Sequence, residues 1–135
     1  MKLNTRNLIA IILGTLMIYI GVHHFRNPRV YDNIVPSYLG YPRFWTLFSG
    51  IIEVVLGLGL IIYKWRSLSA KLLIVFYMIV YLANINMWIN DIPFNGTQLN
   101  QFTHVIRLGI QILLILVCIW ISRCNFSMGK TNKHL

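Results

Sequence analysis

The chain alternates between long apolar segments and short polar connections. Four segments are almost free of charged residues, and a helix needs about 20 predominantly apolar residues to span a bilayer. Because unpaired backbone groups are very costly in lipid, such segments span as helices rather than as open strands. The pattern therefore predicts an all-α, polytopic (multi-pass) membrane protein, a bundle of four transmembrane helices over residues 7–25, 44–63, 70–90 and 104–122.

The connections are too short to hold a folded soluble insert, so residues 1–124 form one transmembrane domain, followed by a flexible cytoplasmic tail over residues 125–135. The first connection is the longest and is rich in proline and tyrosine. Aromatic residues of this kind favour the headgroup level of a membrane. We expect an ordered external loop lying on the bundle, with a short helix around residues 29–34.

Composition supports the membrane assignment, since 57% of the residues are hydrophobic and 11% are charged. Soluble domains have about 45–50% apolar and about 25% charged residues. The first apolar segment follows Lys2 and Arg6 and could be read as a cleaved signal peptide. That segment is long, however, and residues 19–23 make a poor small-residue cleavage site, so we expect a retained first span.

The basic residues predict the orientation, because cytoplasmic connections carry an excess of Lys and Arg. One side of the bundle holds eight of them: Lys2, Arg6, Lys64, Arg66, Lys71, Arg123, Lys130 and Lys133. The other side holds Arg26, Arg29 and Arg43. We expect a plasma-membrane protein with both termini in the cytoplasm. The net charge of +9 then favours anionic lipid, and nucleic acid is excluded as a partner because no basic patch lies on a soluble domain.

Charged residues at membrane depth are the strongest functional signal. Glu53 is the only carboxylate in a predicted span, and Arg107 is the only lysine or arginine in one apart from Lys71 at the edge of the third. Burying a charge there costs at least about 2.5–3.5 kcal/mol, so each should face the bundle and have a partner. We expect the two to meet as an ion pair in the outer half of the bundle. The pair is either a structural contact that fixes helix register or a site for a ligand or proton.

Other polar residues fall on the same level. His104, Arg107 and Gln111 share a helix face by their spacing, and Asn84 follows Tyr77 and Tyr81 on another. We expect a polar chamber beneath the external loop, lined by His24, Glu53, Asn84, Arg107 and Gln111. The secondary candidates are Tyr31, Tyr81, Trp88 and His104. The aromatic stripe on the third span is typical of helix packing, although a quinone slot would use the same residue types.

No metal site and no catalytic residue is predicted. His23 and His24 are adjacent, so they point about 100° apart on a helix, and zinc or copper would need three or four converging ligands. We expect His24 to enter the polar chamber and His23 to face the headgroups without a specific role. Cys118 and Cys124 lie on different helix faces, which argues against a thiol redox centre.

Four short motifs resemble the DoxX-like family of small four-helix membrane proteins. They are "GVHHF..P..Y..IVP" (residues 21–36), "SGIIEVVLGLGL" (49–60), "ANINMW" (83–88) and "RLGIQ" (107–111). The resemblance assigns the family's conserved polar positions to His24, Glu53, Asn84, Arg107 and Gln111. "RLGIQ" lacks the proline of the family pattern, so a straighter fourth helix is expected. Relatives are linked to quinone-coupled thiosulfate oxidation, to oxidoreductase complexes in oxidative-stress defence and, in animals, to receptor-subunit assembly.

Two classes of function follow from the residues and the resemblance. The first is binding of a small amphiphilic, quinone- or lipid-like ligand in the polar chamber, as a subunit of a membrane redox system; a quinone is the only cofactor suggested, and whether a reaction occurs is open. The second is a scaffold whose small-residue faces hold a partner membrane or oxidoreductase protein: Gly14, Gly21, Gly50 and Gly57. A transporter or channel is a third, weaker alternative, which would require a homo-oligomer.

Overall fold

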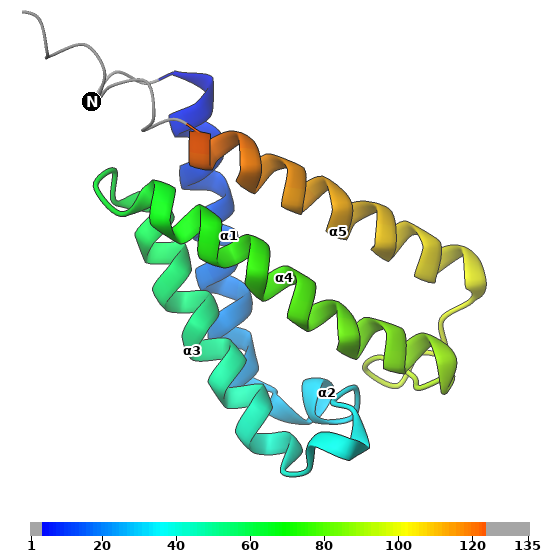
Figure 1. Ribbon diagram of the computed structural model, residues 1–135. Coiled ribbons are helices and arrows are strands. Elements are labelled where there is room, and N and C mark those ends of the chain that lie inside the picture. The colour runs from blue at the N-terminus through cyan, green and yellow to red at the C-terminus, as the bar shows by residue number, and fades with distance from the viewer. Residues whose placement is uncertain (1–3, 124–135) are drawn as a thin grey trace, which may run out of the picture.

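The computed structural model describes residues 4–123, and these residues form an all-α bundle (Figure 1). The elements are α1 (Thr5–Arg26), α2 (Pro28–Asp32), a 3-10 turn (Ser37–Leu39), α3 (Pro42–Ile61), α4 (Arg66–Ile89) and α5 (Gln101–Ser122). The helices α1, α3, α4 and α5 are long and apolar enough to cross a membrane. The predicted four-helix fold is confirmed. The predicted tail and Cys124 lie outside the described residues.

Polar residues at the helix starts explain why the helices extend beyond the apolar segments. The side chain of Asn4 accepts a hydrogen bond from the backbone N–H of Asn7 and caps α1, and Asn100 caps α5 in the same way through the N–H of Thr103. Pro42 occupies the first turn of α3, where its missing N–H costs nothing. The short helix expected near residues 29–34 is present as α2.

The long helices form two antiparallel pairs (Figure 1). α1 packs along α3, and α4 packs along α5. The start of α1 and the end of α5 lie at one end of the bundle, here called the terminal end, together with the short turn between α3 and α4. Residues 27–41 and 90–100 lie at the opposite end, here called the loop end. The first connection therefore covers the loop end of the α1–α3 pair.

Two glycine contacts bring α1 and α3 into backbone contact. A Cβ built on Gly14 would lie 2.6 Å from the carbonyl oxygen of Gly57, and one built on Gly21 would lie 2.7 Å from that of Gly50. The reverse approaches are equally close, so any larger side chain would push the helices apart. The glycine face of α1 therefore packs against that of α3, and these are the faces that we expected to hold a partner's helix.

Apolar packing is concentrated in the terminal half of the bundle. Its centre consists of small and aliphatic side chains from all four long helices, including Ala10, Leu60, Leu73 and Ile121. The apolar side chains on the outside of the four helices are exposed, as expected for surfaces that face lipid. Toward the loop end the buried residues become polar, and this region holds the candidate site.

Candidate functional site

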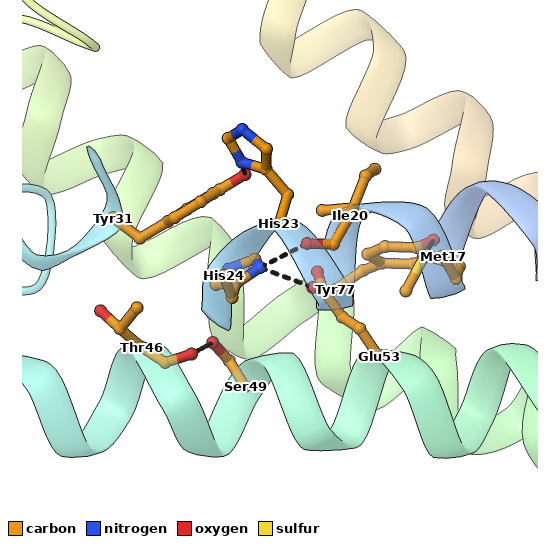
Figure 2. A network of polar contacts seen from close by, with 9 residues as sticks. All are labelled: Met17, Ile20, His23, His24, Tyr31, Thr46, Ser49, Glu53 and Tyr77. Carbon is orange, nitrogen blue, oxygen red and sulfur yellow. Dashed lines mark hydrogen bonds and ion pairs between the residues drawn. The ribbon is translucent and has the colours of Figure 1, made fainter. Parts of the chain in front are cut away.

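The carboxylate of Glu53 meets the imidazole of His24 between α1 and α3 (Figure 2). His24 Nδ1 donates to the carbonyl oxygen of Ile20 at 2.9 Å and lies 3.1 Å from Glu53 Oε2. The two side chains are 8% and 10% exposed. Gly50 makes the approach feasible, since a Cβ there would lie 2.8 Å from His24 Cβ. The pair is ionic when the imidazole is protonated, and Oε2 has no hydrogen-bond donor within the described residues.

Tyr31 of α2 covers this pair from the loop side. Its ring is stacked on His24, with centroids 3.6 Å apart and planes at 19°. Its hydroxyl lies 2.9 Å from His23 Nδ1, and Asn27 Nδ2 lies 3.1 Å from the other ring nitrogen of His23. Burial raises the pKa of the Tyr31 phenol, with a further contribution from the charge of Glu53, so the hydroxyl keeps its proton. The expectation that His23 has no specific role is wrong: it holds the Tyr31 hydroxyl.

Thr46 is a buried site residue that the sequence reasoning missed. It is 2% exposed, and its Oγ1 has no hydrogen-bond partner within residues 4–123. Figure 2 shows Thr46, Ser49 and Glu53 along the side of α3 that faces His24 and Tyr31. The hydroxyl of Ser49 is occupied, because it donates to the Thr46 carbonyl oxygen at 2.9 Å. Thr46 precedes Glu53 by seven residues, and this two-turn helical spacing was the available signal.

Arg107 is paired with Asn84, not with Glu53. Its Nη2 donates to Asn84 Oδ1 at 2.9 Å, and its Nε is buried without a hydrogen-bond partner among the described residues. No ion pair joins Arg107 and Glu53 in the described part of the chain, so the predicted contact is wrong. The reason is helix packing: α3 directs Glu53 toward α1, whereas Arg107 on α5 faces α4.

Aromatic rings connect the two polar pairs. Phe94, from the connection between α4 and α5, lies edge-on to Tyr31 with centroids 6.2 Å apart. The guanidinium of Arg107 lies over the Phe94 ring at 5.2 Å, a cation–π contact. The sequence predicted one chamber, and the structure instead gives two polar pairs joined through Tyr31 and Phe94. We call this arrangement the loop-end cluster: His24, Glu53, Tyr31, Thr46, Asn84, Phe94 and Arg107.

Gln111 lies apart from both pairs, toward the centre of the bundle. Its amide donates to the carbonyl oxygen of Tyr77 at 2.7 Å, which ties α5 to α4. Together with Tyr81 it lines a groove of about 200 Å³ between these helices. A larger groove of about 360 Å³ between α3 and α4 has walls of aliphatic side chains and Phe76. Neither groove includes His24, Glu53, Asn84 or Arg107 in its walls.

Trp88 and His104 form a separate contact at the loop end of α4 and α5. Their rings are stacked with centroids 5.3 Å apart and planes at 7°. The Trp88 indole N–H donates to the Gln101 side chain at 2.6 Å. Tyr77, from the same stripe on α4, donates its hydroxyl to Met17 Sδ at 2.8 Å. These residues hold helices together, in keeping with the packing interpretation of the stripe.

A second buried polar cluster lies at the terminal end, where the sequence suggested only a topology signal. Arg66 is 1% exposed and donates to the carbonyl oxygens of Leu60 (2.7 Å) and Ile61 (3.1 Å) and to Asn7 Oδ1 (2.5 Å). It thereby caps the last turn of α3 and joins it to α1. We call this the terminal-end cluster: Asn7, Arg66 and the two carbonyl groups.

Within residues 4–123, no group of three or more His, Cys, Asp and Glu side chains could hold a metal ion. The comparison with protein families gives one match, to a family described as "Domain of unknown function (DUF8561)", over residues 13–122. The chain belongs to this family. No curated protein and no solved structure matches it. The matched region includes α1 from residue 13 onward, all of α3, α4 and α5, and every residue of the loop-end cluster.

Proposed function

We propose that the protein binds a small amphiphilic, quinone- or lipid-like molecule at the loop-end cluster, as a subunit of a membrane redox system. The chemistry of the cluster and its resemblance to the DoxX-like motifs support this proposal. The assembly alternative has lost its expected surface, because the glycine faces of α1 and α3 pack against each other.

The observation that carries the proposal is incomplete hydrogen bonding in a buried cluster. Thr46 Oγ1 and Arg107 Nε are buried without a hydrogen-bond partner in the described chain, and Glu53 Oε2 accepts no hydrogen bond there beyond its ion pair with His24. A buried polar group without a partner costs about 1–3 kcal/mol, and native proteins hold few of them. A purely structural cluster would be expected to satisfy its own donors and acceptors, as the three guanidinium nitrogens of Arg66 do at the terminal end. Arg6 Nε, one residue before Asn7, is an exception at that end, since it is buried without a hydrogen-bond partner in the described chain.

The bonding capacity left on the Glu53, Thr46 and Arg107 side chains defines which hydrogen-bonding groups a ligand must supply. Glu53 Oε2 accepts a hydrogen bond, Arg107 Nε–H donates one, and the Thr46 hydroxyl does either. A polar head with both hydroxyl and carbonyl character suits this set, and a simple anionic head does not suit the Glu53 carboxylate. His24 balances that carboxylate and can exchange a proton with the bound head. The apolar tail of such a molecule lies in the bilayer beside the helices.

Mass spectrometry of the molecules retained after gentle purification tests this proposal. Glu53→Gln and Arg107→Ala are expected to lower the amount of bound amphiphile at least about tenfold, the effect of losing 1.4 kcal/mol of binding. The matched controls are Asp91→Asn and Lys64→Gln, which alter exposed charges in the connections. Equal retention in all four variants contradicts the proposal. A stoichiometric partner protein without a small molecule supports the assembly alternative instead.

The redox role has its own test. The assay is a quinone-dependent activity of cell membranes that is lost when this protein is absent. Glu53→Gln and Arg107→Ala should abolish that activity, while the folded variants are still extracted from the membrane. An oxidoreductase subunit should co-purify with the wild type. Full activity in both variants contradicts the role in a redox system.

We further propose that the protein lies in the plasma membrane with the terminal end in the cytoplasm, supported by the excess of basic residues at that end. A membrane-impermeant maleimide added to intact cells should label Tyr41→Cys, which is 85% exposed at the loop end. It should not label Lys64→Cys in the turn before α4, and labelling in the reverse order contradicts the orientation.

A further inference from the structure

The space in front of the buried His24–Glu53 pair is filled by a side chain from the first connection. The Tyr31 ring lies nearly parallel to the His24 imidazole with centroids 3.6 Å apart (Figure 2). Its hydroxyl meets His23 Nδ1 at 2.9 Å, and Phe94 touches its edge. Tyr31 is thus held as a ligand would be, by a stacking partner on one face and a hydrogen bond at its tip.

The segment that carries Tyr31 is weakly attached. α2 has five residues, and none of them is buried. Beyond the Tyr31 contacts, α2 is tied by an ion pair in which Arg43 Nε and Nη2 both lie 2.9 Å from Asp32 Oδ2; the Arg43 side chain is 53% exposed and that of Asp32 is 17% exposed. Shortly after α2, Asn86 Nδ2 donates to the Ile34 carbonyl oxygen at 3.2 Å. Exposed ion pairs contribute about 0–1 kcal/mol, and short elements with few buried contacts open locally at low cost.

The chemistry of Tyr31 defines what can replace it. It offers a flat six-membered ring, and its phenol is neutral because burial raises the pKa of the hydroxyl. The stacking surface is His24, and the hydrogen-bonding group at the tip is His23. A saturated ring would lose the stacking, and a charged head would have to be desolvated against these imidazoles.

We propose that Tyr31 is an exchangeable internal ligand, and that the headgroup bound at the loop-end cluster is a flat, neutral six-membered ring with a hydroxyl or carbonyl substituent, of the phenol or quinol class. The headgroup stacks on His24 and bonds to His23 after Tyr31 moves out. This inference rests on the proposed binding function and specifies its ligand. Only molecules in which Tyr31 is displaced can bind the headgroup. The apparent Kd of the wild type is therefore the intrinsic Kd divided by the fraction of molecules in that state.

Equilibrium dialysis of the full chain in nanodiscs against trimethylhydroquinone tests the ligand class, with empty nanodiscs subtracted. Tyr31→Ala should bind this probe at least about tenfold more tightly than the wild type, because the internal competitor is gone. Tyr31→Phe keeps the ring and loses the bond to His23, so it should gain only a few-fold. Adding His24→Ala to Tyr31→Ala should remove the gain. Cyclohexanol is the control with a saturated ring, and its affinity should not increase in Tyr31→Ala relative to the wild type.

A cavity left by Tyr31→Ala could take up any small ring, so the displacement is also measured in the wild type. Peptide-resolved hydroxyl-radical footprinting should show Tyr31 several-fold more reactive with trimethylhydroquinone bound, while the exposed Tyr41 is unchanged. Arg43→Gln, which frees α2 without touching the rings, should raise probe affinity by a few-fold. This footprint remains informative if Tyr31→Ala does not fold.

Unchanged Tyr31 reactivity in the wild type, or equal gains for cyclohexanol and the quinol, overturns the inference. Failure here is distinguishable from failure of the proposed function. If the wild type retains an amphiphile that Glu53→Gln loses, while the quinol probe does not displace Tyr31, the binding function stands and the exchange of Tyr31 is wrong.

Discussion

The two ends of the bundle each bury a polar cluster between α1 and α3, and they differ in how completely its atoms are paired. At the terminal end, the guanidinium of Arg66 is bonded to Asn7 and to two carbonyl groups of α3. At the loop end, Thr46 Oγ1 and Arg107 Nε are buried without a hydrogen-bond partner in the described chain, and Glu53 Oε2 has only its ion pair with His24. The first arrangement joins helices, and the second retains bonding capacity for something else.

The surroundings of the clusters differ in the same sense. The terminal-end cluster adjoins the apolar core and a short turn between α3 and α4. The loop-end cluster is covered by α2 and by the connection that carries Phe94. Connections carry function more often than core elements do because they can move without unfolding the scaffold. This difference is the basis of our proposal that the loop-end cluster binds a ligand, whereas the terminal-end cluster joins helices.

The largest effect is expected from breaking the saturated cluster. Arg66→Ala removes three hydrogen bonds of a buried cation and should lower the free energy of unfolding by about 3 kcal/mol or more. SDS titration followed by circular dichroism measures it. Lys64→Ala, an exposed neighbour in the same turn, should change stability by less than about 0.5 kcal/mol. The folded fraction of Arg66→Ala should retain as much amphiphile as the wild type. Loss of the amphiphile from this folded fraction would mean that the two clusters are not separate in function.

The next effect separates stability from binding with two matched glycines. Gly50→Ala and Gly57→Ala each place a Cβ within 3.0 Å of the facing helix, and overpacking of this kind costs about 1–3 kcal/mol. Only Gly50→Ala pushes on His24, so it alone should lose the bound amphiphile. Thermal unfolding and mass spectrometry on the same samples check both quantities.

Gly109→Ala is the control for these two changes, because a Cβ there meets nothing within 4 Å. It should be neutral or stabilise by up to about 1 kcal/mol, as helix propensity predicts. Equal loss of ligand in Gly50→Ala and Gly57→Ala would show that helix spacing in general, rather than the position of His24, controls binding.

The smallest expected effect is an increase in stability, opposite to the losses predicted for Arg66→Ala, Gly50→Ala and Gly57→Ala. Thr46→Val replaces a hydroxyl without a partner by a methyl group of similar size, so the ligand-free protein should become more stable by up to about 1 kcal/mol while amphiphile affinity falls. In Thr15→Val the lost hydroxyl was satisfied, since Oγ1 donates to the Ile11 carbonyl oxygen at 2.8 Å, so no gain is expected. Destabilisation by Thr46→Val in the ligand-free state argues that the hydroxyl has a structural partner.

The sequence predicted the helices well because long apolar segments in a membrane have one structural solution. It also singled out His24, Glu53, Asn84 and Arg107, since polar residues at depth are rare and visible. It did not predict which of them pair. Helical spacing shows which residues share a face, but not which neighbouring helix that face meets.

One overlooked signal bears on that choice. Gly14 and Gly21 on α1 and Gly50 and Gly57 on α3 are both seven residues apart, and this matched spacing fits an antiparallel contact that turns Glu53 toward His24. Arg66 was missed for a different reason: a basic residue beside a span resembles a topology signal unless its buried acceptors are known. The contacts of His23 and Phe94 depend on how the connections fold back, which spacing along the chain does not encode.

The central claim is that the loop-end cluster is incomplete without a bound molecule, and the most direct test is the change in stability when retained amphiphiles are stripped. A ligand held at about 100 times its Kd contributes about 2.7 kcal/mol. Stripping should therefore cost the wild type about 2–3 kcal/mol, recovered on adding back the extract, and should cost Glu53→Gln about 1.4 kcal/mol or less, the value for a site at least tenfold weaker. An equal loss in the wild type and in Glu53→Gln would contradict the claim, since the stabilising molecules would then be bound elsewhere.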